Sequence, residues 1–194
     1  MTISEIGLRE QILDTARILF IQQGYHGLAM RQISESVGVS KAALYYHFKD
    51  KEELFLAILN LYLNEIEGII DEIQSKPISS SEQIRTFVEY ILGQPAEKRA
   101  VMRLGSQEMS QLSANSRKVF GITYHEKFIG KLIAIIQAGI ESREFQSLNA
   151  EVATWALLGM MYPYFYPAVA RNGEPVPASV IDEIVTIYLK GIEK

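Results

Sequence analysis

The side chains best suited to a chemical role are cationic and aromatic, and they cluster near the N-terminus. Between residues 31 and 51, basic side chains outnumber acidic ones: Arg31, Lys41, Lys49 and Lys51 against Glu35 and Asp50. Cations of this kind neutralise the phosphates of a nucleic acid, and the resulting binding depends on salt. This basic cluster is small, so one subunit should neutralise few phosphates. We therefore expect two copies of the chain to bind together.

Two short helices and a glycine turn are predicted to carry these side chains. Met30, Ile33 and Val37 recur at the spacing of one helical face. Gly38 follows at a position where a left-handed residue ends a helix, and glycine adopts that conformation without a steric penalty. Ser40 can then cap a second helix by accepting a hydrogen bond from a free backbone N–H.

In the second helix, Leu44 and Phe48 lie one turn apart and predict an inward face. The other side chains are left to point elsewhere: Lys41, Ala42, Ala43, Tyr45 and His47. Two short helices joined by a tight turn form a helix-turn-helix, whose second helix enters the major groove of DNA.

The sequence around these helices resembles the DNA-binding domain of the TetR family of bacterial transcriptional regulators. The resemblance covers about the first quarter of the chain and rests on many positions at fixed spacing: Ile12 to Ala16, Leu19, Phe20, Gly24, Tyr25, Met30, Arg31, Ile33, Val37 to Lys41, Leu44 to Phe48 and Lys51 to Leu54. The family usually has Thr at Leu28 and Ser or Thr at Ala29, whose hydroxyls cap the second helix and contact a phosphate. It often has Gly-Thr where this chain has Ala42 and Ala43, so base contacts there should be mostly apolar.

This resemblance implies a set of DNA-binding residues. They are Arg31, Ser40, Lys41, Ala42, Ala43, Tyr45, Tyr46, His47 and Lys51. We expect Tyr45, His47 and Lys51 to contact the sugar–phosphate backbone. Lys41 and Ala42 should lie nearest the base edges.

The composition excludes several classes of protein. The chain has 194 residues, enough for one or two domains, and no Cys, which excludes disulfides, thiolate metal sites and cysteine nucleophiles. Its net charge is −4, and because residues 1–50 hold five basic and five acidic side chains, the excess negative charge lies in the rest of the chain. The first residues lack a basic start followed by an apolar run, which predicts no signal peptide and a cytoplasmic location. Because the sequence has no catalytic, metal or cofactor motif, we expect no enzyme activity, metal or cofactor.

Helical periodicity predicts an all-α protein with about nine helices. The first should run to about residue 23 and end at Gly24. The fourth should begin at Asp50, which forms a capping box with Glu53, and stop before Pro77. After a capping box at Ser79, further helices are expected over about 79–93, 95–112, 116–141, 149–170 and 178–192.

Val152 to Ala170 is a run of 19 residues without charge, long enough to raise a transmembrane interpretation. Pro163 and Pro167 would free backbone carbonyls in lipid. The favoured interpretation is a helix covered by its own core on one side and by a second subunit on the other. The family resemblance implies that the last two helices pair with those of a partner. The last helix carries an apolar stripe that fits either this interface or an internal core: Val180, Ile184, Tyr188 and Ile192.

The sequence therefore predicts a DNA-binding head at residues 1–48 and a helical ligand-binding and dimerisation domain at residues 49–194. We expect a homodimeric repressor that binds double-stranded DNA at an inverted-repeat operator and is released by a small apolar or aromatic effector, with no membrane partner. Candidate ligand-binding residues are Met102, Arg103, Gln107, His125, Phe128, Trp155 and Met160. Two alternatives stay open: polar members of this set can be ordinary solvated or structural residues, and the protein can bind DNA without an effector.

Overall fold

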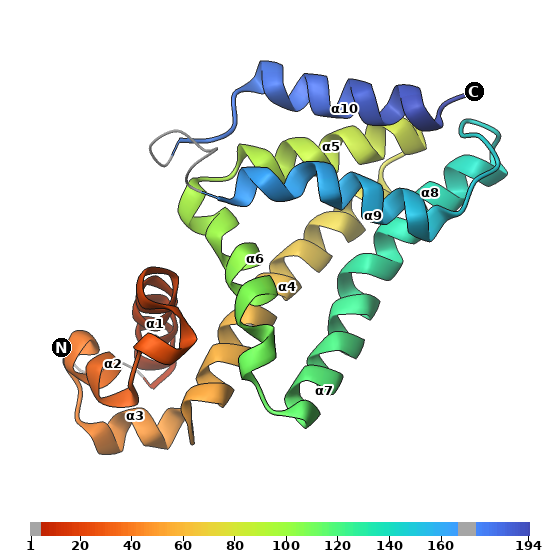
Figure 1. Cartoon of the computed structure of the whole chain (residues 1–194). Helices are drawn as coiled ribbons and strands as arrows, with labels where there is room; N and C mark the ends of the chain where they lie inside the picture. Colours follow the sequence, from red (N-terminus) through yellow and green to blue (C-terminus); the bar gives the residue numbers. More distant parts are fainter. Residues whose placement is uncertain (1–4, 167–173) are drawn as a thin grey trace. The chain divides into compact units, whose positions relative to one another are not determined.

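The computed structural model describes residues 5–166 and 174–194, and within these ranges every regular element is helical (Figure 1). The helices are α1 (Glu5–Gly27), α2 (Met30–Val37), α3 (Lys41–His47), α4 (Lys51–Ser75), α5 (Ser80–Gly93), α6 (Ala96–Glu108), α7 (Ala114–Tyr124), α8 (Gly130–Glu141), α9 (Ala150–Met161) and α10 (Ala178–Ile192). Three short turns supplement them: η1 (Met109–Gln111), η2 (His125–Ile129) and η3 (Tyr162–Phe165). The predicted all-α fold is confirmed.

The chain forms two compact units. The first comprises residues 1–62 and 104–120, and the second comprises residues 63–103 and 121–194. The chain passes from one unit to the other within α4, α6 and α7. This division differs from the predicted one after residue 48, because the first half of α4 and a later segment both pack with the N-terminal helices.

The first unit has an aromatic core where α1 meets α4. The ring centroid of Phe20 lies 5.1 Å from that of Phe55, and the ring of Tyr25 lies 5.2 Å from Phe55. Gly24 interrupts α1 with φ of 72°, as the sequence predicts, and one further turn brings Tyr25 back onto the core. Edge-to-face aromatic contacts of this kind favour one fixed packing of the rings.

Glu52 links α4 to α7 within the first unit. Its carboxylate accepts hydrogen bonds from the backbone N–H of Ser113 at 3.0 Å, from the Ser113 hydroxyl at 2.7 Å and from the Ser116 hydroxyl. These hydrogen bonds lower the pKa of Glu52, the one from Ser116 contributing most. A negative charge at the start of a helix also suits the helix dipole, so Glu52 fixes where α7 begins.

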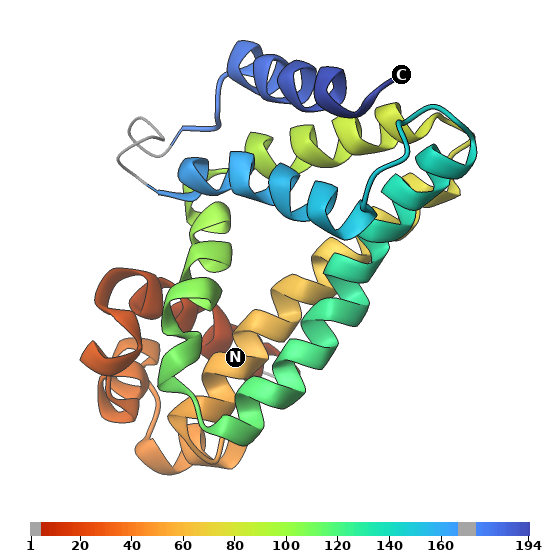
Figure 2. The same cartoon turned by 45° about the vertical axis from the view of Figure 1, so that its right-hand side comes forward.

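In the second unit, α9 and α10 lie side by side over α5 and α8 (Figures 1 and 2). The close approach of α8 to the loop that follows it depends on Gly139, where a Cβ atom would lie 2.3 Å from the Phe145 ring. Phe145 forms a β-bridge with Glu193, so the end of the chain is paired with this loop.

A buried arginine ties the ends of several elements together in the second unit. Arg99 is 1% exposed and donates hydrogen bonds to backbone carbonyls of Leu92 at 3.1 Å, Gln94, Tyr164 at 3.1 Å and Glu174 at 3.0 Å. Guanidinium has five N–H donors, which suits it to a site with several carbonyl groups. Arg99 thus joins the end of α5, the turn η3 and the segment before α10.

Two predicted helices differ from the structure. The long helix expected over 116–141 is present as α7, the π-helical turn η2 and α8, which follow without a break. The helix expected over 149–170 ends at Met161, and Pro163 lies in the 3₁₀ turn η3 that follows. A proline inside a helix lacks the backbone N–H that the helix needs, which explains the early end. The rest of this prediction, residues 167–170, lies outside the described residues.

In the part of the chain that the structure describes, no helix is long and apolar enough to cross a membrane.

Candidate nucleic-acid interface

The predicted helix-turn-helix forms through local hydrogen bonds. Gly38 adopts φ of 79° and its N–H bonds the carbonyl of Ser34 at 3.0 Å, which ends α2. The Ser40 hydroxyl accepts a hydrogen bond from the N–H of Ala43 at 3.1 Å, which starts α3. Leu44 and Phe48 are 0% and 1% exposed. The inward face of α3 and the cap at Ser40 are therefore confirmed.

The opposite face of α3 is open to solvent. Lys41 and Ala42 are exposed, as are Tyr45 at 41% and Tyr46 at 74%, while His47 is half-buried. The Lys41 ammonium lies 5.6 Å from the centroid of the Tyr45 ring. Ala43, the remaining predicted contact on this helix, is half-buried. An exposed helix face with a cation, methyl groups and phenols matches the chemistry of a surface that reads DNA.

The start of α2 lacks a hydroxyl cap, as the residues at 28 and 29 predict. Gln32 replaces part of its function, because its side-chain oxygen accepts a hydrogen bond from the N–H of Ala29 at 2.7 Å. The phosphate contact that a hydroxyl at position 28 or 29 would provide has no equivalent in Leu28, which is buried, or in Ala29.

Lys51 has a different environment from the one expected. Its ammonium donates hydrogen bonds to the carbonyls of Tyr25 at 2.6 Å and Leu28 at 2.9 Å, and it lies 4.3 Å from the centroid of the Tyr25 ring. Burial lowers the pKa of Lys51, opposed by the negative charge of Glu108. This geometry favours a structural role at the corner after α1 over the predicted phosphate contact.

Arg31 and Ser40 are also engaged within the domain. The Arg31 guanidinium lies 2.7 Å from the carboxylate of Glu35 on the same helix, and both side chains are exposed. An exposed pair of this kind contributes little to stability, so DNA could displace the Glu35 carboxylate at little cost. The Ser40 hydroxyl oxygen is already used by the cap, although its O–H remains a donor.

In the second unit, the predicted ligand-binding residues occupy different environments. Phe128 is fully buried, with its ring centroid 5.3 Å from Tyr124 and 6.0 Å from Phe87. Burial raises the pKa of Tyr124 to about 12, so this phenol stays neutral at physiological pH. These three rings form the aromatic cluster of the second unit.

The remaining candidates differ from this cluster, because they are less buried or belong to the first unit. Arg103 is half-buried and its guanidinium lies 5.7 Å from the centroid of the Tyr166 ring. Met102 and Met160 are half-buried, and His125 is exposed. Gln107 is exposed and belongs to the first unit. Of the predicted set, only Phe128 lies in a fully buried environment.

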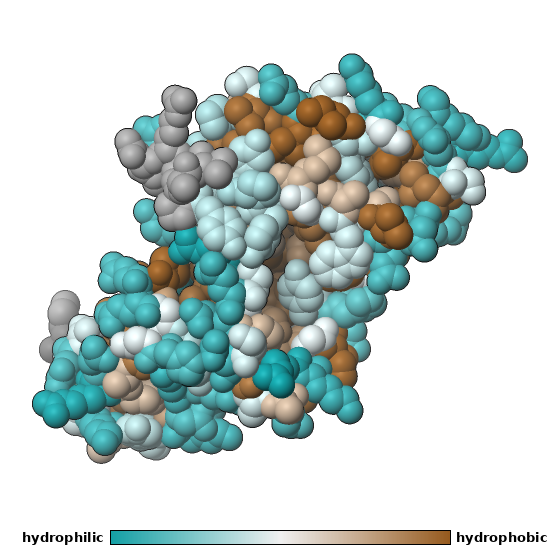
Figure 3. Space-filling view, viewed as in Figure 1, coloured by the Kyte–Doolittle hydropathy of each residue, from teal (hydrophilic) through white to brown (hydrophobic). Residues whose placement is uncertain are grey.

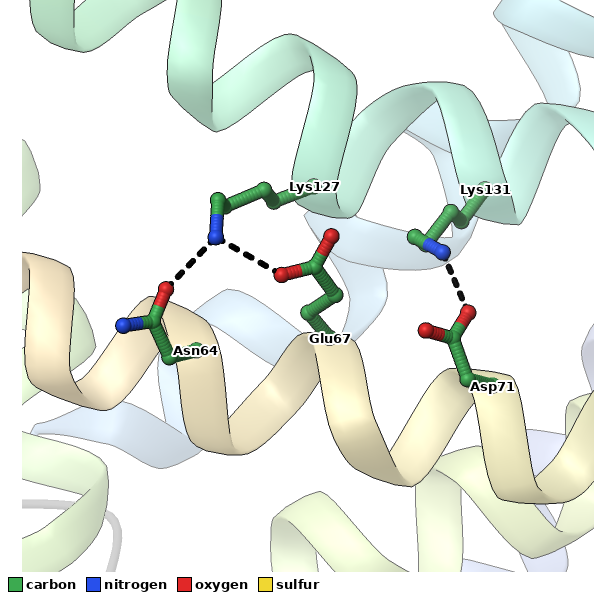
Figure 4. Close-up of polar contacts among 5 residues, drawn as sticks. All are labelled: Asn64, Glu67, Asp71, Lys127 and Lys131. Atoms are coloured by element: carbon green, nitrogen blue, oxygen red, sulfur yellow. Dashed lines mark hydrogen bonds and ion pairs between the residues drawn. The ribbon is translucent and has the colours of Figure 1, made fainter.

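The packing of α4 against η2 and α8 uses a ladder of polar contacts (Figure 4). The Lys127 ammonium donates to the side chains of Asn64 at 2.7 Å and Glu67 at 2.8 Å, and Lys131 pairs with Asp71. Each partially exposed pair contributes about 1 kcal/mol or less. The ladder therefore serves mainly to set the register of the second half of α4 within the second unit.

Large apolar side chains remain exposed on α9 and α10. Val152 is 65% exposed, Trp155 50% and Ile187 64%, and apolar residues gather over these two helices in the space-filling view (Figure 3). By contrast, most of the stripe predicted on the last helix is internal core, because Ile184 and Tyr188 are 5% and 4% exposed. Large exposed apolar side chains that gather on a surface are typical of protein–protein contacts.

The capped helix-turn-helix places the chain in the class of helix-turn-helix DNA-binding proteins. Residues 12–58 match the model of the bacterial regulatory proteins of the tetR family, and residues 77–192 match the model of the tetracyclin repressor-like C-terminal domain. The chain belongs to the tetR family of bacterial regulatory proteins.

Several characterised proteins are similar over most of their length. The HTH-type transcriptional repressor KstR2 of Rhodococcus jostii is 25% identical over 153 residues, which are 78% of this chain and 75% of that protein. The solved structure of the regulator PfmR of Thermus thermophilus has 27% identity and a TM-score of 0.76, covering 94% of this chain and 99% of that one. AibR, solved in complex with isovaleryl coenzyme A and operator DNA, has 22% identity and a TM-score of 0.77, covering 93% and 97%. At that identity the likeness to AibR concerns the fold.

Proposed function

We propose that this protein is a homodimeric repressor that binds an inverted-repeat operator through α3 and leaves it on binding a small apolar or aromatic molecule. The observation that carries the proposal is the solvent-facing side of α3. A helix capped by Ser40 and anchored by Leu44 and Phe48 presents a cation, methyl groups and phenols outward. Relatives that are transcriptional repressors support the same conclusion.

In the proposed complex, Lys41 and Ala42 lie nearest the base edges, and Tyr45 and His47 contact the backbone. The methyl group of Ala42 suits an apolar neighbour such as the methyl group of thymine. Specificity from one such helix is modest, so two half-sites about 34–36 Å apart, one turn of DNA, are needed for a specific site. The small excess of positive charge in each head also calls for two copies.

The proposed dimer pairs the faces of α9 and α10 that carry Val152, Trp155 and Ile187. When a second copy covers this apolar surface, the surface loses contact with water. Each Å² of apolar area buried in this way stabilises the dimer by about 25 cal/mol. Because a two-fold axis pairs the same patch with itself, one apolar face is sufficient for a closed dimer. Membership of a family with known dimers supports this assignment.

The proposed effector site lies in the second unit, near the aromatic cluster of Phe87, Tyr124 and Phe128. Aromatic and apolar side chains with a few polar groups are typical of sites for small organic molecules. The neutral phenol of Tyr124 can donate a hydrogen bond to such a molecule. The complex of AibR with isovaleryl coenzyme A supports a site for an organic molecule in a protein of this fold.

Release from DNA requires that the effector prefer the conformation that does not bind the operator. The shift is then limited by the ratio of its affinities for the two conformations. The same coupling free energy acts in both directions, so operator DNA must weaken effector binding by the same factor.

Selection of binding sites from random DNA tests the first part of the proposal. The expected result is an inverted repeat that binds far more tightly than random DNA at the same salt concentration. A ligand-independent DNA-binding protein is the alternative. Candidate effectors are compounds that raise the thermal midpoint of the protein. Calorimetry measures the affinity of the protein for such a compound with and without the selected operator. Equal affinities in the two titrations would exclude that compound as the releasing effector.

A further inference from the structure

Arg9 of α1 covers an aromatic ring at the end of α3. Its guanidinium carbon lies 5.1 Å from the centroid of the Phe48 ring, and Phe48 caps the C-terminal end of α3. Phe48 is 1% exposed, whereas Arg9 is exposed. Guanidinium stacks through its flat face, which leaves its N–H groups, directed outward in its plane, suited to a phosphate.

The arginines of α1 and α2 other than Arg9 have carboxylate partners. Arg31 pairs with Glu35, and Arg17 lies 3.9 Å from the carboxylate of Asp14. Among the side chains that the structure describes, those of residues 7–166 and 174–194, none forms an ion pair with Arg9. A cation that has an aromatic support and no carboxylate partner there can bind an external anion without first breaking an ion pair.

Arg9 and Lys41 lie near opposite ends of α3. Lys41 is the first residue of this seven-residue helix and is held over the Tyr45 ring, while Arg9 is held over the ring that follows the helix. The helix is about 10 Å long, close to the width of about 12 Å of the major groove. Cations near its two ends can therefore reach phosphates on both sides of the groove.

A cation at the C-terminal end of α3 is also favoured electrostatically. The C-terminal end of a helix carries a partial negative charge, which repels a phosphate. A guanidinium stacked directly beside that end offsets the repulsion.

We propose that Arg9 contacts a DNA phosphate beside the C-terminal end of α3, and that the Phe48 ring positions it. This inference rests on the proposed DNA binding and adds to it a contact from α1, outside the helix-turn-helix. Arg9 contributes to affinity for any DNA sequence, because a phosphate contact carries no base information.

Three variants separate the charge of Arg9 from its packing. Arg9→Met still covers the Phe48 ring but removes the charge, and Arg9→Lys keeps the charge without the planar stack. Arg17→Met is the matched control, since it removes a paired arginine from the same helix. Thermal midpoints measured for all three establish that each variant is folded.

Fluorescence anisotropy with a random-sequence duplex of about 30 base pairs measures the effect, since that length holds two half-sites. For Arg9→Met, the slope of log affinity against log salt should become shallower by about 0.9 per subunit. The ratio of wild-type affinity to Arg9→Met affinity should accordingly fall by about threefold per subunit when salt rises from about 50 to about 200 mM. Arg9→Lys and Arg17→Met should keep the wild-type slope.

A wild-type slope for folded Arg9→Met would overturn the proposal for Arg9 and leave the proposed DNA binding intact. An equal loss of slope in Arg17→Met would also overturn it, because the effect would then reflect the net charge of α1. If the wild-type protein showed no salt-dependent binding to the duplex, the proposed function and this inference would both fail.

Discussion

Glu144 provides a sharp test of what holds the second unit together. Its carboxylate accepts hydrogen bonds from the backbone N–H groups of Ser80 at 2.9 Å and Ser81 at 2.8 Å, at the start of α5. Burial opposes ionisation of Glu144, but the hydrogen bonds from Ser81 and Ser80 outweigh it, so the pKa of Glu144 lies below 4.5. We predict that both Glu144→Gln and Glu144→Ala destabilise the protein, the second more strongly.

The magnitude follows from the number of hydrogen bonds lost. A hydrogen bond to a charged group contributes about 1.5–3 kcal/mol, and partial exposure of Glu144 places both of its bonds at or below the lower end. Glutamine keeps one oxygen acceptor but loses the charge, so Glu144→Gln should cost about 1 kcal/mol. Glu144→Ala leaves both N–H groups without this partner and should cost about 2 kcal/mol, which corresponds to about 4–8 °C in the thermal midpoint.

The pH dependence identifies the carboxylate as the cause. Because the pKa of Glu144 is lower in the folded protein than the 4.5 of the unfolded chain, its contribution is fully present above 4.5. The contribution is lost as the pH falls through the folded pKa, where Glu144 becomes neutral like glutamine. Urea unfolding followed by circular dichroism at neutral pH and at about pH 4 should therefore show a smaller difference between wild type and Glu144→Gln at the lower pH.

A suitable control is Glu141→Gln. Glu141 is exposed at the end of α8 and accepts a hydrogen bond from the side chain of Gln137 at 2.9 Å. Its replacement should change the free energy of unfolding by about 0.5 kcal/mol or less. Glu144→Gln as stable as Glu141→Gln, or a deficit that stays constant down to low pH, would refute the assigned role of the carboxylate.

Two further predictions concern packing and assembly. Gly139→Ala should lower the free energy of unfolding by about 1–3 kcal/mol, because the new Cβ atom would overlap the Phe145 ring. Gly68→Ala is the control: its Cβ atom would lie in open space, so this variant should be neutral or stabilising. Urea unfolding measures both. Ile187 is 64% exposed, so Ile187→Lys should yield folded monomers in sedimentation velocity. Ile184 is 5% exposed, so Ile184→Asp should unfold the second unit. A folded monomer of the Ile184→Asp variant, or an Ile187→Lys variant that dimerises as the wild type does, would contradict this assignment of the two faces.

The features that the sequence predicts well are those whose partners lie within a few residues. Gly38 ends α2, Ser40 caps α3, and Ser79 caps α5 by accepting a hydrogen bond from the N–H of Glu82 at 3.2 Å. A helix cap depends on residues two or three positions away, so the residue types are sufficient evidence. Even there, details differ: Glu53 reaches back to the N–H of Lys49 at 3.0 Å, one residue before the expected position.

Contacts between distant segments had no such signal. Lys127 meets Asn64 and Glu67, and Glu144 caps α5, across separations of about 60 residues. Periodicity identifies an apolar face but does not identify its partner, which explains why the sequence left both core and interface open for Ile184, which is buried in the structure. The same limit applies to Trp155, whose residue type suits a ligand site but whose position is on the exposed face of α9.

Lys51 is the residue at which sequence and structure give opposite expectations, and one variant decides between them. If its ammonium mainly holds the carbonyls of Tyr25 and Leu28, Lys51→Met leaves two acceptors without this donor and should lower stability by about 2 kcal/mol. The salt slope of DNA binding would then stay unchanged in the folded variant. If Lys51 instead contacts a phosphate, the stability should hardly change and the slope should become shallower by about 0.9 per subunit. We expect lower stability and an unchanged salt slope, because an ammonium that already makes two hydrogen bonds and lies over a ring gains little from a phosphate. A stable variant with a shallower salt slope would instead support the phosphate contact predicted from the sequence.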